Sequence, residues 1–216
     1  MKKLLFIVTA LSLFVACSHS ESGLGDPLVS GIFSRNIKTV THELSEDTYK
    51  KKSSKYTSYK NFLDVRLNQK RDLHGKTPLF WGCMANYSSS KQLKKVEKKR
   101  LEIVKLLVEK GADITLKDNE GWTPLVWASW SGTDKIVSFL LNKGAKINVQ
   151  TDKKWTSLMA ASLRGYDVVV KLLLDRSADK TVKNSDGETA LDIARTYQKM
   201  YPNKKVAYDK IISYLQ

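Results

Sequence analysis

Apolar residues are distributed differently along three parts of this chain. Residues 4–16 form an uninterrupted run without charge, directly after two lysines. The following forty residues are polar and show little periodicity, as in a loosely extended segment. From about residue 59 onward, apolar side chains return at helical spacing. The pattern predicts a leader at 1–16, a flexible tether at 17–58 and a helical domain at 59–216.

The apolar run of the leader is too short to cross a bilayer. It has 13 residues, whereas a membrane-spanning helix needs about 20. A positive start followed by a short apolar run is typical of a secretory signal peptide. The end of the run, Phe14-Val15-Ala16-Cys17, resembles the lipobox of bacterial lipoproteins, although Phe14 stands where leucine is usual.

The lipobox resemblance implies cleavage before Cys17 and acylation of its thiol, with chains such as palmitate. The protein would then be anchored in a bacterial cell envelope, at the inner or the outer membrane. Several acyl chains hold a protein at a membrane almost irreversibly. The alternative is a plain signal peptide that is cleaved elsewhere.

The helical domain repeats two short motifs in register. The first motif, a turn followed by a helix start, occurs as GKTPLF at 75–80, GWTPLVWA at 121–128, KWTSLMAA at 154–161 and GETALDIA at 187–194. The threonines of these stretches are 46, 33 and 33 residues apart. The second motif is an apolar helix, as in IVKLLVEKGADI, IVSFLLNKGAKI and VVKLLLDRSADK. A recurring period of 33 residues indicates stacked units that bury their faces against one another.

The first motif combines residues that suit a tight turn and a helix start. Glycine adopts positive φ without a Cβ clash, threonine caps a helix, and proline fits its first turn. The third unit departs from this pattern, because Lys154 replaces the turn glycine and Ser177 replaces the glycine that ends the second helix. We therefore expect strain in that unit.

The period and the two motifs together resemble the ankyrin repeat, over roughly residues 59–216. The resemblance implies an all-α fold, an ankyrin-repeat solenoid of about four helix-turn-helix repeats with short β-turn fingers. The repeats would cover about 72–115, 116–148, 149–181 and 182–216. A short helix from about Tyr59 to Leu67 would form a cap before the first of them.

The first repeat carries 13 extra residues, since its threonine spacing is 46 instead of 33. These residues lie at about 86–98 and are rich in lysine. The insertion is either a basic binding finger or a helical extension with a solvated lysine face.

Ankyrin proteins bind partners mainly through the fingers and the ends of the inner helices, which line a concave groove. The matching positions in this chain are Asn119, Glu120, Trp122, Trp130, Asp152, Lys153, Trp155, Leu163 and Arg164. Four of them, Trp122, Trp155, Trp130 and Leu163, are expected to form an exposed apolar patch, which is typical of an interaction site. Trp81 and Trp127 are expected to fill the core instead. The alternative is that the exposed rings lie on lysine stems and only stabilise the fold.

Candidate catalytic and metal-ligating residues do not form a recognisable pattern. His19, His42 and His74 are scattered, and Cys83 is the only cysteine besides Cys17. The spacing of these residues does not match that of a zinc site. Because nucleophile and phosphate-loop motifs are also missing, we expect no enzymatic activity, no cofactor and no metal.

The charge leaves a second class of function open. The formal charge is +15, and removal of the two leader lysines would leave +13. Such a surface is either simply solvated or binds anionic lipid or another polyanion, although secretion argues against nucleic acid. The leading hypothesis is a monomeric, membrane-anchored module that binds an unidentified protein through its groove. An inhibitor or protective protein of the envelope would use the same residues.

Overall fold

The computed structural model describes residues 27–52, 58–69, 72–84 and 93–216. The early helices are α3 (Pro27–Phe33), α4 (Ile37–Glu43), α5 (Glu46–Lys51) and α6 (Tyr59–Asp64), with a π-helical turn η2 (Val65–Gln69). The later helices are α7 (Pro78–Cys83), α8 (Leu93–Glu109), α9 (Pro124–Trp130), α10 (Asp134–Asn142), α11 (Ser157–Arg164), α12 (Asp167–Leu174), α13 (Ala190–Met200), a 3₁₀ turn η3 (Pro202–Lys204) and α14 (Lys205–Leu215).

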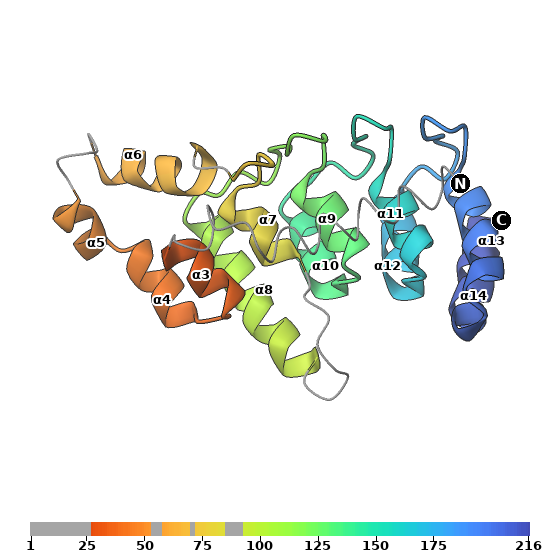
Figure 1. The fold of residues 1–216 in the computed structure, drawn as a ribbon, viewed down its shortest axis with the longest axis horizontal. Coiled ribbons are helices and arrows are strands. Elements are labelled where there is room, and N and C mark those ends of the chain that lie inside the picture. The colour runs from red at the N-terminus through yellow and green to blue at the C-terminus, as the bar shows by residue number, and fades with distance from the viewer. Residues whose placement is uncertain (1–26, 53–57, 70–71, 85–92) are drawn as a thin grey trace.

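Four helix pairs are stacked side by side from α7 to α14 (Figure 1). Helices α7, α9, α11 and α13 form one layer, and α8, α10, α12 and α14 form the second layer. The loops that join successive pairs all project to the same side of the stack (Figure 1). The described residues contain no β-strand, so the predicted all-α solenoid is confirmed.

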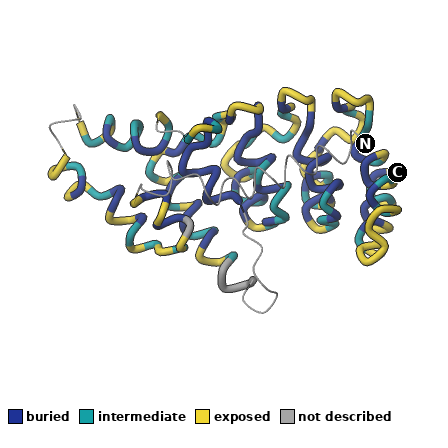
Figure 2. Tube along the Cα trace, viewed as in Figure 1, coloured by how far each residue is buried: buried dark blue, intermediate teal, exposed yellow. Residues whose placement is uncertain are grey.

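A continuous apolar core runs between the two helix layers (Figure 2). The leucines that follow the turn motif, Leu79, Leu125 and Leu158, are at most 1% exposed. The first apolar residues of the second motif, Ile103, Ile136 and Val169, are buried to the same degree. Since these positions recur once per repeat, each pair buries its faces against its neighbours.

The threonine caps form as the motif predicts in three of the four repeats. Thr123, Thr156 and Thr189 each accept a hydrogen bond from the backbone N–H three residues later, at 3.3–3.4 Å. Thr77 makes no such bond, and its hydroxyl is buried without a partner. The first repeat therefore begins its inner helix without a side-chain cap.

The strained positions of the third repeat are confirmed. Lys154 has φ 57°, against 77° for the matching Gly121 and Gly187, and Ser177 has φ 63°, against 99° and 89° for the matching Gly111 and Gly144. The left-handed conformation is unfavourable for residues with a Cβ atom. At both positions the third repeat keeps the positive φ of the other repeats, although it lacks the glycine that adopts this conformation most readily.

The flexible tether predicted for residues 17–58 is wrong for residues 27–51, which form three helices. Helix α3 packs on α7 and α4 packs on α8, so the two helices add a further pair to the stack. Leu28, Val40 and Leu44 are buried in the core. Because α3 and α4 have only seven residues each, their own helical pattern is weak and packing supplies their stability.

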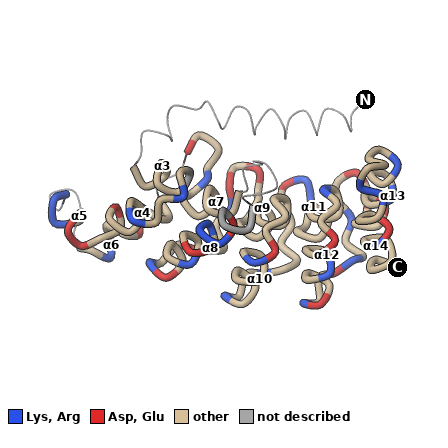
Figure 3. The backbone as a smooth tube through the Cα atoms, turned by 90° about the horizontal axis from the view of Figure 1, so that it is seen from below, with Lys and Arg blue, Asp and Glu red and all other residues tan. Residues whose placement is uncertain are grey.

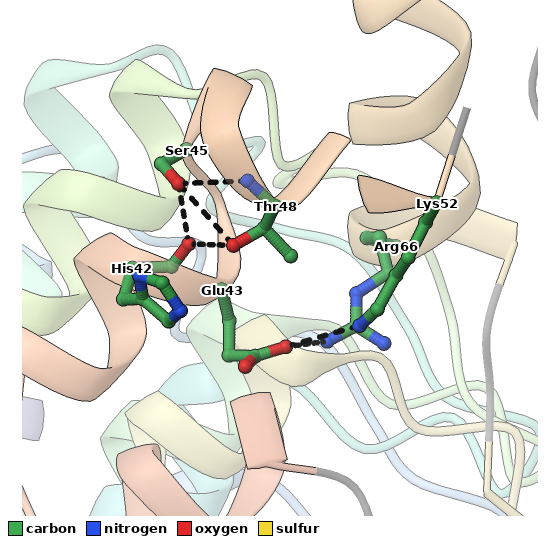
Figure 4. A network of polar contacts seen from close by, with 6 residues as sticks. All are labelled: His42, Glu43, Ser45, Thr48, Lys52 and Arg66. Carbon is green, nitrogen blue, oxygen red and sulfur yellow. Dashed lines mark hydrogen bonds and ion pairs between the residues drawn. The ribbon is translucent and has the colours of Figure 1, made fainter. Parts of the chain in front are cut away.

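The segment between this N-terminal pair and α7 is joined to it by an ion network (Figure 4). Glu43 of α4 accepts a hydrogen bond from Arg66 of η2 at 3.1 Å and lies 3.6 Å from Lys52. Glu43 and Arg66 are 9% and 6% exposed. The cap predicted near Tyr59 to Leu67 is present as α6 and the start of η2, with Phe62 fully buried.

Candidate functional site

The loops between successive helix pairs form four fingers, at residues 72–76, 118–122, 151–155 and 184–188. Neighbouring fingers are joined by backbone hydrogen bonds, in which Asn119 donates to His74, Asp152 to Glu120 and Ser185 to Lys153, at 2.9–3.1 Å. Within the second finger, Asp118 accepts from the N–H groups of Glu120 and Trp122. These bonds hold the four fingers in a rigid row.

The finger tips carry exposed side chains, including the four predicted there: Asn119, Glu120, Asp152 and Lys153. Leu73, at the tip of the first finger, is 74% exposed and was missed as a candidate. Its backbone carbonyl accepts a hydrogen bond from the Asn119 side chain. The signal for it was present in the sequence, because Leu73 occupies the position of Asn119 one repeat earlier.

The predicted exposed apolar patch is wrong for three of its four members. Trp122, Trp155 and Leu163 are only 5–6% exposed. Trp122 packs with Val126 and with Ala160 of the following repeat, where the small alanine leaves room for the indole. Trp155 lies in the main core. Both fingers therefore direct an indole inward, beneath their exposed tips.

Partly exposed indoles are instead contributed by helix α9. Trp130 was predicted on the surface, whereas Trp127 was predicted in the core and is only partly buried. The ring centroid of Trp122 lies 4.8 Å from that of Trp127 and 5.5 Å from that of Trp130. The ring planes of Trp122 and Trp130 are nearly perpendicular. We call Trp122, Trp127 and Trp130 the tryptophan cluster.

A cation lies against each side of the tryptophan cluster. The Lys76 Nζ atom is 4.9 Å from the Trp127 ring centroid, and the Arg164 Cζ atom is 5.1 Å from that of Trp130. Both distances suit cation–π attraction. The Trp127 Nε1 group also donates to Asp118 at 2.9 Å. The cluster is thus fixed by charge and hydrogen bonds, with two ring surfaces left partly open.

The opposite face of the stack carries a shallow groove of about 480 Å³ over α8, α10 and α12. Apolar side chains and two lysines line it, together with Asp134 of α10. Glu97 of α8 lies close to that carboxylate, and burial together with Asp134 raises the pKa of Glu97. Lys135 approaches Glu97 to 3.9 Å and offsets part of this effect.

Two observations on the described residues bear on metal binding and on nucleophilic chemistry. Among them, no group of histidine, cysteine and acidic residues could hold a metal ion. Burial raises the pKa of the Cys83 thiol to about 12, so the thiolate needed of a nucleophile is scarce at neutral pH. No helix in the described ranges is both long and apolar enough to span a membrane.

Two predicted features fall on residues that the structure does not describe. Cys17 and the leader lie before residue 27. Most of the basic insertion at 86–98 also lies outside the described residues, and its last six residues belong to α8. The acylation of Cys17 and the role of the insertion therefore stay predictions.

Comparison with known families identifies the repeat unit. A family model described as ankyrin repeats in three copies matches residues 62–151, and a second, described as ankyrin repeats in many copies, matches residues 140–194. Together they span 62–194, which is more than half of the chain. The helices α3 to α5 precede both matches. No curated protein gives a significant match.

Proposed function

Because the chain belongs to the ankyrin-repeat family, we propose that it is a non-enzymatic module that binds a protein partner in the groove beside its fingers. The observation that carries this proposal is the tryptophan cluster. Trp127 and Trp130 present partly open rings on a short rigid helix, below exposed finger tips. Tryptophan is enriched among the residues that dominate interface energies.

The fixed geometry of the cluster favours binding. Association is weakened when side chains must be ordered in the interface. Here Lys76 and Asp118 already hold the Trp127 ring, and Arg164 lies against Trp130. A partner that brings apolar side chains with acidic neighbours would contact the two rings and the half-buried Arg164, while Lys76, only 2% exposed, supports the Trp127 ring from below.

We also propose that the chain is a monomer anchored in a bacterial envelope through lipidated Cys17. The first described helix begins at Pro27, so nine residues, 18–26, separate it from the anchor. Nine residues can span at most about 32 Å. The anchor would therefore hold the N-terminal helix pair close to the membrane.

Anionic lipid is a second candidate ligand, favoured by the lysines of α5. Lys50 and Lys51 are exposed on α5, at the N-terminal end of the stack (Figure 3). This end is the one that lies nearest to the proposed anchor in the sequence. Each lysine near an anionic surface contributes about 1 kcal/mol to attraction. Such binding should be lost in moderate salt, whereas binding through the tryptophan cluster should persist.

The decisive experiment is a pull-down from solubilised envelopes with residues 18–216 as bait. Trp130→Ala combined with Arg164→Ala removes one open ring and its cation, both only partly buried. Val168→Ala, a 60% exposed residue of the opposite groove, is the matched control. The fold of each bait is checked by circular dichroism.

Capture of one protein by the parent and the Val168→Ala control, but not by the double variant, would support the groove. Equal capture by all three baits would contradict it. Anchoring is tested separately by labelling cells with a radioactive fatty acid. Cys17→Ser should abolish the label, and a label that persists would refute acylation at Cys17.

A further inference from the structure

Two arginines lie at the junction between the N-terminal helix pair and the first ankyrin repeat. Arg100 of α8 is only 5% exposed. Its Nη1 atom donates to the backbone carbonyl of Trp81, in the last turn of α7, at a long 3.3 Å. One long hydrogen bond satisfies little of a guanidinium group that has five N–H donors.

Arg35 belongs to the turn between α3 and α4. Its φ is 55°, a conformation that is unfavourable for arginine. Its Nε atom is buried and has no hydrogen-bond partner. Because α3 packs on α7 and α4 packs on α8, this turn lies at the same junction as Arg100.

The two guanidinium groups are close enough to influence each other. Burial lowers the pKa of Arg100 to about 10, and the charge of Arg35 contributes to this lowering. The nearby Cys83 thiol has a smaller opposite effect. The junction therefore brings the charge of the half-buried Arg35 near that of the buried Arg100.

The described part of the chain provides no carboxylate partner for either arginine. Arg66, which is also buried, pairs with Glu43 at 3.1 Å, and the half-buried Arg164 lies on the Trp130 ring. Burying unpaired like charges is strongly unfavourable. An anion between the two guanidinium groups would remove this imbalance.

We propose that Arg35 and Arg100 bind a phosphate group at this junction. A guanidinium group offers two parallel N–H donors that match phosphate oxygens. A phosphate group carries about one to two negative charges at neutral pH, one in a diester headgroup and up to two in free phosphate, so either offsets charge of the two arginines. The ligand is either free phosphate or the phosphate of a lipid headgroup. The second source rests on the proposed anchoring, which holds this end of the stack near the membrane.

Thermal unfolding of residues 18–216 tests the site, in inorganic phosphate and in chloride at equal ionic strength. Phosphate that binds only the folded chain should raise Tm by about 2–4 °C. Arg35→Gln and Arg100→Gln should each abolish this rise. Arg176→Gln is the matched control, because Arg176 is exposed and its guanidinium group donates to the Asn142 side chain at the surface.

A second readout separates binding from a purely structural role. In chloride, Arg35→Gln should raise Tm, because it removes like-charge repulsion at the junction. A structural arginine would instead lower Tm when replaced. Arg100→Lys keeps the charge without the paired donors and should retain only part of the phosphate effect. Should Arg100→Gln fail to fold, Arg35→Gln decides the question.

Sedimentation with phosphatidylglycerol vesicles distinguishes the two sources of phosphate. Vesicle binding that is lost in Arg35→Gln but kept in Arg176→Gln indicates a headgroup. A Tm rise without vesicle binding indicates free phosphate. The proposal is overturned if phosphate raises Tm no more than chloride does and Arg35→Gln leaves vesicle binding unchanged. It is also overturned if Arg35→Gln and Arg100→Gln both keep the Tm rise in phosphate. The groove variant Trp130→Ala/Arg164→Ala should keep the Tm rise in phosphate. A failure of partner binding in the groove would therefore be distinguished from a failure of phosphate binding at the junction.

Discussion

The two left-handed residues of the third repeat allow a direct test of the strain argument. Lys154→Gly and Ser177→Gly should each stabilise the protein. A residue with a Cβ atom is less stable in the left-handed conformation by about 1–2 kcal/mol. Glycine in turn loses about 0.4–1 kcal/mol through the greater freedom of the unfolded chain. The net gain is therefore about 0.5–1 kcal/mol for each substitution.

The structure shows that glycine would lose little else at either position. Both side chains are exposed, so their removal uncovers no core. The Lys154 N–H donates to Thr151 at 2.8 Å, and the Ser177 N–H donates to Leu174 at 2.9 Å. Glycine keeps both backbone bonds. The sites lie at opposite ends of the repeat, so we expect their effects to add.

Urea unfolding followed by circular dichroism would measure the gain. The double variant should gain about 1–2 kcal/mol, and each kcal/mol raises Tm by about 2–4 °C in a protein of this size. Lys180→Gly is the control, because Lys180 is also exposed in a turn but has no positive φ. It should lose stability. If all three glycine substitutions destabilise equally, the strain argument is refuted.

Three further outcomes can be checked in the same way. Gly121→Ala should destabilise more than Gly187→Ala in urea unfolding, because both have φ 77° but only the Cβ added at Gly121 would meet the next finger, at 2.8 Å from a backbone nitrogen. Tyr208→Phe should lower the unfolding free energy by about 1–2 kcal/mol, since its buried hydroxyl donates to a carbonyl of α11 at 2.7 Å; a neutral result would show that this bond adds nothing. Glu97→Gln should stabilise the protein at pH 7, and the gain should shrink as pH falls toward 4.5, because a raised pKa in the folded state weakens stability only while the carboxyl is ionised.

The repeated part of the fold could be predicted because its signals are local. Three of the four repeats mark the turn with a glycine, and all four mark the helix cap with a threonine and the start of the inner helix with a leucine. In the last three repeats these positions recur in register with a period of 33. The N-terminal pair could not be recognised this way. Helices α3 and α4 have seven residues each, and their stability comes from packing on each other and on α7 and α8.

In the groove, the motif positions could be predicted from the sequence, whereas the exposure of their side chains could not. Its finger positions were predicted correctly, but the exposure of the rings was not. Trp122 turns inward because Ala160, on the following repeat, is small enough to accommodate it. Trp127 is left partly open because Lys76 and Asp118 hold it at the surface of the cluster. Exposure depends on pairs of side chains from different repeats, which no single motif contains.

The same dependence on neighbours makes α7 the element that connects the two proposed sites. The Trp81 carbonyl accepts the hydrogen bond of Arg100, and the Trp81 ring lies 5.9 Å from the Lys76 Nζ atom. Lys76 in turn contacts Trp127 of the tryptophan cluster. In a solenoid each repeat acts mainly on its neighbours, so a ligand at Arg100 of α8 could act on the groove through α7, or through α10, since both helices pack on α9. Contact alone does not establish coupling. Because Trp81 contacts both Arg100 and Lys76, a change in its packing is the event to look for if phosphate alters partner binding in the groove.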